Sequence, residues 1–418
     1  MTIYALILLA PFMLLNKKII LIIVATLIVC GALVSWWYAS ADEWLLSREG
    51  AQCQKLDSSD VEELSCLLQV VFERVRNESI ASGYKAFTYF YEQYPIFGAS
   101  GCHQHAHRVG DTVYYELFVA RGLTLDDIDF PHETTSCGYG FWHGFVEHLI
   151  QDHPEPAYVA EVCEYLRNRF GETMKDIGTI CYHASGHGFT MARADTLSED
   201  EWGPLSTYVN KPVVNCESLP DIPEREVEDC REGVFNIVSD WMTKGDLGLS
   251  FNYDEPFTEC EALTSRWHEA CYYEFAMKLE PITGDNPVAA AKYVQSIGNT
   301  ELREIAFGVM IAGMMQRQAP LDGYGAVIQS CLSITDASLV NICVRSAING
   351  MMEHGSPGTE YKKILLVCDS KEIAEAGQAG HCYRTLAARL SRFYEPEKKR
   401  SICEEFPEVY KEECIQTP

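Results

Sequence analysis

The histidines of this chain are concentrated in one stretch, at spacings that suit metal coordination. Nine of the 12 histidines fall between residues 103 and 187, and seven of those nine lie in three short segments. Each segment contains two potential ligands four residues apart, and these pairs are His103/His107, His143/Glu147 and His183/His187. In a helix, side chains four residues apart project from one face, so each pair can reach a single ion.

These side chains predict a site for a divalent transition metal. Imidazole suits zinc, copper and iron, and a carboxylate adds a harder ligand or a general base. The predicted metal ligands are His103, His107, His143, His183 and His187. Glu147 is predicted as a further ligand or as the catalytic base. Such a set suffices for one metal with an open coordination position, or for two metals about 3.5 to 4 Å apart.

The other histidines and the nearby aromatic residues have simpler interpretations. His105 and His148 lie off the paired faces and are interpreted as outer or surface groups. Isolated histidines are usually packing or capping residues, and five receive no chemical role: His132, His153, His268, His354 and His381. Non-covalent haem is the less favoured cofactor, because the aromatic residues around the clusters fit a helix-packing core better. Covalent haem is disfavoured because the C-x-x-C-H motif is absent.

The cysteines predict how the elements that carry these histidines are held. Sixteen of the 17 form eight sequential couples, which are Cys53/Cys66, Cys102/Cys137, Cys163/Cys181, Cys216/Cys230, Cys260/Cys271, Cys331/Cys343, Cys368/Cys382 and Cys403/Cys414. Except in the second couple, the partners stand 11 to 18 residues apart, which suits two helices joined by one disulfide. Structural zinc is the alternative, but C-x2-C does not occur. Disulfides require an oxidising compartment.

A repeated motif follows the second cysteine of several couples. His143-Gly144 and His187-Gly188 stand six and seven residues after Cys137 and Cys181, while later copies have Asn236 or Asn349-Gly350 at these places. The two glycines after histidine are expected to let another backbone approach closely. The apolar spacing around the cysteines is helical, and strand signals are sparse.

We therefore predict an all-α, irregular solenoid-like array of disulfide-stapled helical hairpins. It resembles tetratricopeptide-type solenoids in general design only and satisfies none of the named repeat patterns. The predicted domains are residues 42–200, a helical domain with the histidine clusters, and residues 201–418, a region of helical-hairpin repeats.

Residues 1–41 are predicted to form an N-terminal membrane anchor that precedes this array in the chain. Residues 19–38 form an apolar run long enough to cross about 30 Å of hydrocarbon as a helix. Lys17 and Lys18 precede it, which places the following chain outside the cytoplasm, periplasmic or extracellular. Ala39-Ser40-Ala41 also fits a signal-peptide cleavage site, so removal of the segment is the alternative.

The charge of the chain limits its partners. Its formal net charge is −27, which disfavours binding to nucleic acid. The leading hypothesis is a membrane-anchored, extracytoplasmic metal-binding protein. One form of this hypothesis is a metal-dependent enzyme that uses the His/Glu cluster. The alternative is a non-catalytic helical-repeat scaffold that binds another envelope protein. The sequence leaves open which reaction, if any, is catalysed.

Overall fold

The computed structural model describes residues 24–26, 42–54, 59–99, 101–318 and 323–417. These residues contain helices and connecting turns, and no strand occurs among them, which confirms the predicted all-α class. The chain divides into two compact units, residues 1–67 and 68–418. The functional residues discussed below all belong to the second unit. The predicted boundary between residues 200 and 201 stays a prediction.

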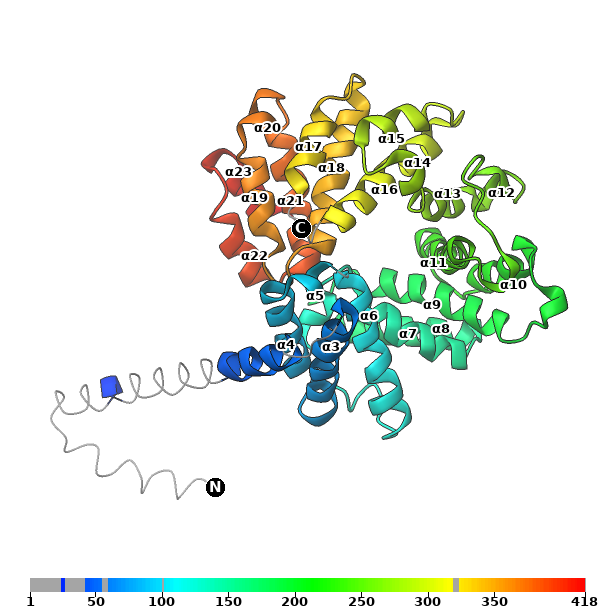
Figure 1. Cartoon of the computed structure of the whole chain (residues 1–418), viewed down its shortest axis with the longest axis horizontal. Helices are drawn as coiled ribbons and strands as arrows, with labels where there is room; N and C mark the ends of the chain where they lie inside the picture. The colour runs from blue at the N-terminus through cyan, green and yellow to red at the C-terminus, as the bar shows by residue number, and fades with distance from the viewer. Residues whose placement is uncertain (1–23, 27–41, 55–58, 100, 319–322, 418) are drawn as a thin grey trace. The chain divides into compact units, whose positions relative to one another are not determined.

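The long helices that line the inside of the second unit follow one another along the chain. They are α6 (Cys102–Thr112), α7 (Gly140–Asp152), α9 (Ile177–Ala194), α11 (Glu224–Lys244), α13 (His268–Ala276), α16 (Thr300–Gln318), α18 (Ala337–His354) and α21 (Ala379–Phe393). Each packs against the next in this order, and Figure 1 shows the succession. Such packing is what an array of repeated hairpins produces, since each hairpin buries its apolar face against its neighbours.

Most of these helices have an outer partner that precedes or follows them in the chain. The partners are α8 (Pro156–Phe170), α10 (Leu205–Glu217), α12 (Thr258–Glu261), α15 (Pro287–Val294), α17 (Tyr324–Leu332), α19 (Glu360–Cys368) and α23 (Glu408–Gln416). The remaining elements are α3 (Asp60–Asn77), α4 (Ile80–Gln93), α5 (Pro95–Ala99), α14 (Glu280–Thr283), α20 (Lys371–Glu375), α22 (Pro396–Cys403), a π-helix η2 (Val113–Val119) and the 3-10 turns η3 (His132–Thr135), η4 (Glu199–Glu201), η5 (Asp246–Gly248) and η6 (Ser265–Trp267).

All eight predicted cysteine couples are disulfide-bonded. Six of them join an outer helix to the inner helix of its hairpin or, for Cys403–Cys414, join α22 to α23. The α15/α16 hairpin has no disulfide, which explains the longest interval between successive couples in the sequence. The serial connectivity follows from the fold because the two helices of a hairpin are neighbours in both sequence and space.

The array curves back on itself, so that α21 and the end of α18 contact α4, η3 and the segment before α7. The Tyr139 hydroxyl, just before α7, donates a hydrogen bond to the Arg392 carbonyl at 3.0 Å. The His132 Nε2 atom donates to the Phe393 carbonyl at 2.8 Å, and the Tyr91 hydroxyl donates to the His354 carbonyl at 3.1 Å. The second unit is thus a closed succession of hairpins, where the sequence indicated only an irregular solenoid.

The predicted membrane span, residues 19–38, lies outside the described residues except for a short helical stretch at 24–26. No helix within the described ranges combines the length and the apolar character that crossing a membrane requires.

Non-reducing peptide mapping of the purified protein is expected to recover Cys216 with Cys230, Cys260 with Cys271, and Cys331 with Cys343. Each closed loop should stabilise the fold by about 2 to 4 kcal/mol, because the cross-link removes conformations from the unfolded chain. Recovery of these residues as free thiols would contradict both the connectivity and the oxidising compartment.

Candidate metal site

The six predicted site residues lie in one connected cluster on α6, α7 and α9. Three overlapping groups within it each bring three potential ligand atoms within 4.8 Å of one another. The groups are His143/His183/His187, His107/Glu147/His187 and Asp111/Glu147/His148. His103 belongs to none of these groups, but its ring centroid lies 4.9 Å from that of His143.

His143, His183 and His187, which we call the imidazole triad, form the group best suited to a metal. Their ring centroids are 4.9 to 5.4 Å apart. The Nε2 atoms of His143 and His187 are buried and have no hydrogen-bond partner among the described residues. A buried polar atom without a partner destabilises a fold by about 1 to 3 kcal/mol, and a metal ion would satisfy both of these nitrogens.

Neighbouring groups orient two of the triad rings, those of His187 and His183. His187 Nδ1 lies 3.0 Å from Glu147 Oε2, and His183 is hydrogen-bonded to the backbone of Asp229. Next to the triad, His103 Nδ1 donates to the Cys137 carbonyl at 2.9 Å. Metal-binding histidines commonly use one nitrogen for the ion and the other for a carboxylate or carbonyl, which fixes the ring orientation.

The histidines at one end of the cluster, His103, His143 and His183, are uncharged. Burial lowers the pKa of His103 to about 4 and lowers the pKa values of His143 and His183 well below the usual range. The neighbouring imidazoles lower them further, because two adjacent cations repel each other. These histidines are therefore neutral at pH 7, which is the form that binds a metal.

At the other end of the cluster, His107, Asp111 and Glu147 form a charged network. Burial would lower the pKa of His107, but its hydrogen bonds with Asp111 and Glu147, at 3.3 and 3.1 Å, raise it to about 10. Burial would raise the pKa of Glu147, but hydrogen bonds from His107 and His187 lower it to about 2. His107 is thus an imidazolium between two carboxylates and must lose a proton before it can bind a metal.

Glycines determine how closely the three histidine-bearing helices approach. A Cβ atom at Gly144 would lie 2.2 Å from the His107 carbonyl oxygen, and one at Gly188 would lie 2.6 Å from the Glu147 carbonyl oxygen. This confirms the expectation for both glycines that follow histidine. Gly233 of α11 extends the pattern, since its Cβ would lie 1.9 Å from the His183 carbonyl oxygen. Because no side chain separates the backbones, short imidazole groups on different helices can meet.

Two residues of the cluster were not predicted from the sequence. Asp111 contacts His107 and also lies 3.4 Å from His148 Nε2, so His148 belongs to the network and is not a detached surface group. The signal for Asp111 was its position four residues after His107 on the same helical face.

His105 is buried, and its ring packs against Phe97 with a centroid distance of 4.7 Å, so it is a core residue.

The aromatic residues near the cluster pack on one another. Phe141, Trp142 and Phe145 are fully buried on α7, and the ring of Phe130 contacts all three. Trp142 Nε1 donates to the Thr134 hydroxyl at 3.1 Å. Phe141, Trp142 and Phe145 therefore belong to the helix-packing core, which was the favoured interpretation of the aromatic residues near the clusters.

The imidazole triad adjoins a cavity of about 350 Å³. His103, His143 and His183 line it, together with residues of α11, α13, α18 and α21. Two of the three triad residues, His143 and His183, therefore border the cavity.

Comparison of the chain with protein-family models, with curated proteins and with solved structures finds no match to any of them.

Proposed function

We propose that this protein binds a divalent transition metal through His143, His183 and His187. One observation carries the proposal: the Nε2 atoms of His143 and His187 are buried and have no hydrogen-bond partner among the described residues. The imidazole of His183 lies within ligand distance of both residues. Three imidazoles favour zinc, with iron and copper as the alternatives that the same donors accept.

The adjoining cavity supports a catalytic form of this proposal. Catalytic zinc sites use three protein ligands and leave one position for water or substrate, whereas structural sites are closed by four. A metal at the triad would lower the pKa of a bound water and so supply a nucleophile at neutral pH. With one metal bound, Glu147 orients His187. It becomes a ligand or base if a second metal occupies the His107/Glu147/His187 group.

The proposed location is outside the cytoplasm. Eight disulfides support it, because disulfides persist in oxidising compartments and are rare in the cytosol. Anchoring through the apolar run at residues 19–38 remains part of the proposal, as does an envelope partner.

Metal content tests the proposed function directly. The body from Asp42 onward, purified with its disulfides intact, is dialysed against zinc, and its bound metal is measured by elemental analysis. We expect one equivalent per chain in the parent. His143→Asn and His187→Asn should each weaken binding by at least about 100-fold, because every lost ligand removes a bond to the ion.

These substitutions should leave the fold intact. Asn occupies the equivalent repeat position at Asn236 and Asn349, and for His143→Asn unfolding measured in EDTA should change little. His187→Asn also loses the contact with Glu147 and should be somewhat less stable while remaining folded. His153→Asn is the matched control, because His153 is exposed and lies outside the cluster. If the parent binds no metal, or if the two variants bind as well as the control, the metal proposal is wrong. The helical-repeat scaffold that binds another envelope protein then takes its place.

A further inference from the structure

Besides histidines, the cavity beside the imidazole triad is lined by acidic and basic side chains. Its lining includes six carboxylates, contributed mainly by α11, α13 and α18, which are Asp176, Asp229, Glu232, Asp240, Glu274 and Glu353. Four basic side chains also line it, and these are Arg225, Lys278, Arg389 and Arg392. With its histidines neutral and its carboxylates counted as ionised, the lining has a formal excess of two negative charges.

Three of the four basic side chains each pair with one carboxylate. Lys278 pairs with Asp240, Arg389 with Glu353, and Arg392 with Asp176. These pairs neutralise themselves and leave no charge for a ligand.

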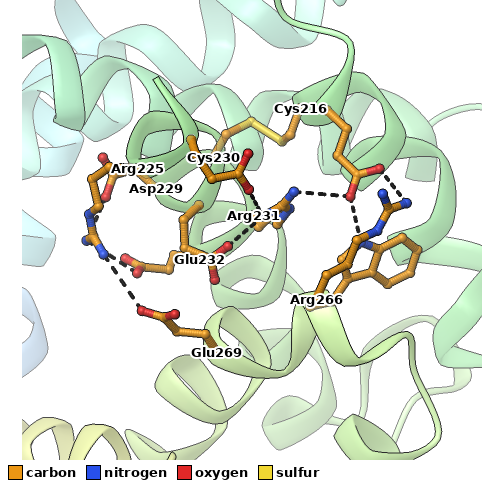
Figure 2. Close-up of polar contacts among 12 residues, drawn as sticks. Cys216, Arg225, Asp229, Cys230, Arg231, Glu232, Arg266 and Glu269 are labelled. Atoms are coloured by element: carbon orange, nitrogen blue, oxygen red, sulfur yellow. Dashed lines mark hydrogen bonds and ion pairs between the residues drawn. A yellow bond between two sulfur atoms is a disulfide. The ribbon is translucent and has the colours of Figure 1, made fainter. Parts of the chain in front are cut away.

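The unbalanced charge lies at Asp229, Glu232 and Glu274. Figure 2 shows that Arg225 is shared, with Asp229 Oδ1 at 2.8 Å, Glu232 Oε1 at 3.4 Å and Glu269 at 3.9 Å. Glu274 has no basic partner within ion-pair distance among the described residues. Its contact is a hydrogen bond donated by the Asn236 amide at 2.6 Å. Glu269 does not line the cavity, so among the lining residues, counted as ionised, one negative charge is in excess beside Arg225 and another at Glu274.

These carboxylates are deeply buried, so their excess charge is costly without a ligand. Asp229 and Glu274 are each 1% exposed and Glu232 is 6% exposed. Asp229 lines the cavity, and its Oδ2 atom is buried with no hydrogen-bond partner in the described chain. Burying a charge without full compensation destabilises a protein by several kcal/mol, which a bound cation would offset.

The spacing of the acids points to an organic cation and not to a metal ion. Within the described residues, the groups of three ligands that converge to metal distances all lie in the histidine cluster, and none includes Asp229, Glu232 or Glu274. An ammonium group has three donors directed to separate acceptors, so it suits carboxylates that do not converge on one point. Two excess charges at two places match a ligand with two ammonium groups.

We propose that this cavity binds a linear aliphatic diamine, with one ammonium group at Asp229 and Glu232 and the other at Glu274. Burial raises the pKa of Glu274 to about 7, and the hydrogen bond from Asn236 only partly offsets this. Burial also raises the pKa of Glu232 well above its usual range. A nearby ammonium lowers both pKa values again, so binding at pH 7 should release protons from Glu274 and Glu232. The proposal stands without a metal at the imidazole triad.

Calorimetric titration with 1,4-diaminobutane tests the proposal, carried out in EDTA so that the metal proposal does not affect it. At pH 7 and about 0.15 M salt we expect one diamine per chain, and a binding heat that changes with the ionisation enthalpy of the buffer. Glu274→Gln and Glu232→Gln should each weaken binding at least about tenfold, since a hydrogen bond to a charged group contributes about 1.5 to 3 kcal/mol. 1,4-Butanediol, of similar length but uncharged, should not bind.

Glu228→Gln is the matched control. Glu228 is also a buried acid of α11, but it pairs with Arg231 at 2.7 Å and does not line the cavity. Its loss leaves Arg231 with Glu217 and Glu224 and should not change diamine binding. The proposal is overturned if the parent does not bind the diamine at millimolar concentrations. It is equally overturned if all three variants bind as the parent does, because the heat then reflects the overall acidity of the chain.

Discussion

Gly233→Ala is expected to lower the free energy of unfolding by at least about 3 kcal/mol. The added Cβ would lie 1.9 Å from the His183 carbonyl oxygen and 3.2 Å from Gly186 Cα, so both nearest obstacles are backbone atoms that cannot rotate away. Since His183 would be displaced with its carbonyl, zinc affinity should fall as well.

Urea unfolding in EDTA measures the first effect and zinc titration the second. Gly325→Ala is the control, because Gly325 lies in α17 with no atom within 4 Å of its added Cβ. This control should be neutral or more stable by about 0.5 to 1 kcal/mol, since alanine has less freedom in the unfolded chain. Equal stability of the two variants would contradict the close approach of α9 and α11.

Glu147→Gln should destabilise the metal-free protein by about 1 to 3 kcal/mol, because the half-buried His107 cation keeps Asp111 but loses its second carboxylate partner. It should also weaken metal binding by about 10 to 100-fold, since His187 loses the carboxylate that orients it. Urea unfolding in EDTA and zinc titration measure the two effects. A variant with unchanged stability and affinity would remove Glu147 from the site.

The pH dependence of the same network has a definite sign. The pKa of His107 is raised from 6.5 to about 10, so its contribution to stability is complete below pH 6.5 and is lost as the pH rises through 10. The pKa of Glu147 is lowered to about 2, so its contribution is present above pH 4.5 and is lost as the pH falls through 2. Metal-free stability from this pair should therefore be greatest between pH 4.5 and 6.5, and Glu147→Gln should flatten the alkaline decline.

The local parts of this structure could be predicted because their signals are local. The partners of a helical hairpin are close in sequence, so the intervals within cysteine couples predicted the disulfides. Spacing by four residues predicted which of His103, His107, His143, Glu147, His183 and His187 share a helix face, and the repeat alignment linked α7 to α9. The structure brings five of these residues into groups of potential ligands, and His103 lies beside His143 outside those groups.

The cavity could not be predicted in this way, because its wall combines distant segments. Tyr139 meets Arg392 across more than two hundred residues, and no local pattern reports such a contact. His354 received no role from the sequence, yet it lines the cavity. A signal did exist for two of the acids: Asp240 and Glu353 stand ten residues after Cys230 and Cys343, as Glu147 does after Cys137.

His105 lies off the His103/His107 face as predicted, but its interpretation as an outer or surface group is wrong, because it is a core residue. A helical projection separates one face from another, but it cannot show that both faces of α6 are covered. Phe87 and Phe97, from the preceding helical segments, enclose His105, while α7 covers the side that carries His103 and His107.

The serial order of the disulfides bears on how the protein matures. If the chain is exported as proposed and each couple closes in turn, each second cysteine meets only the unpaired cysteine of its own hairpin when it emerges. Oxidation in order of appearance then yields the native pairing without reshuffling, a process that takes seconds to hours when it is needed. This protein should accordingly depend on a thiol oxidant for its biogenesis and little on a disulfide isomerase.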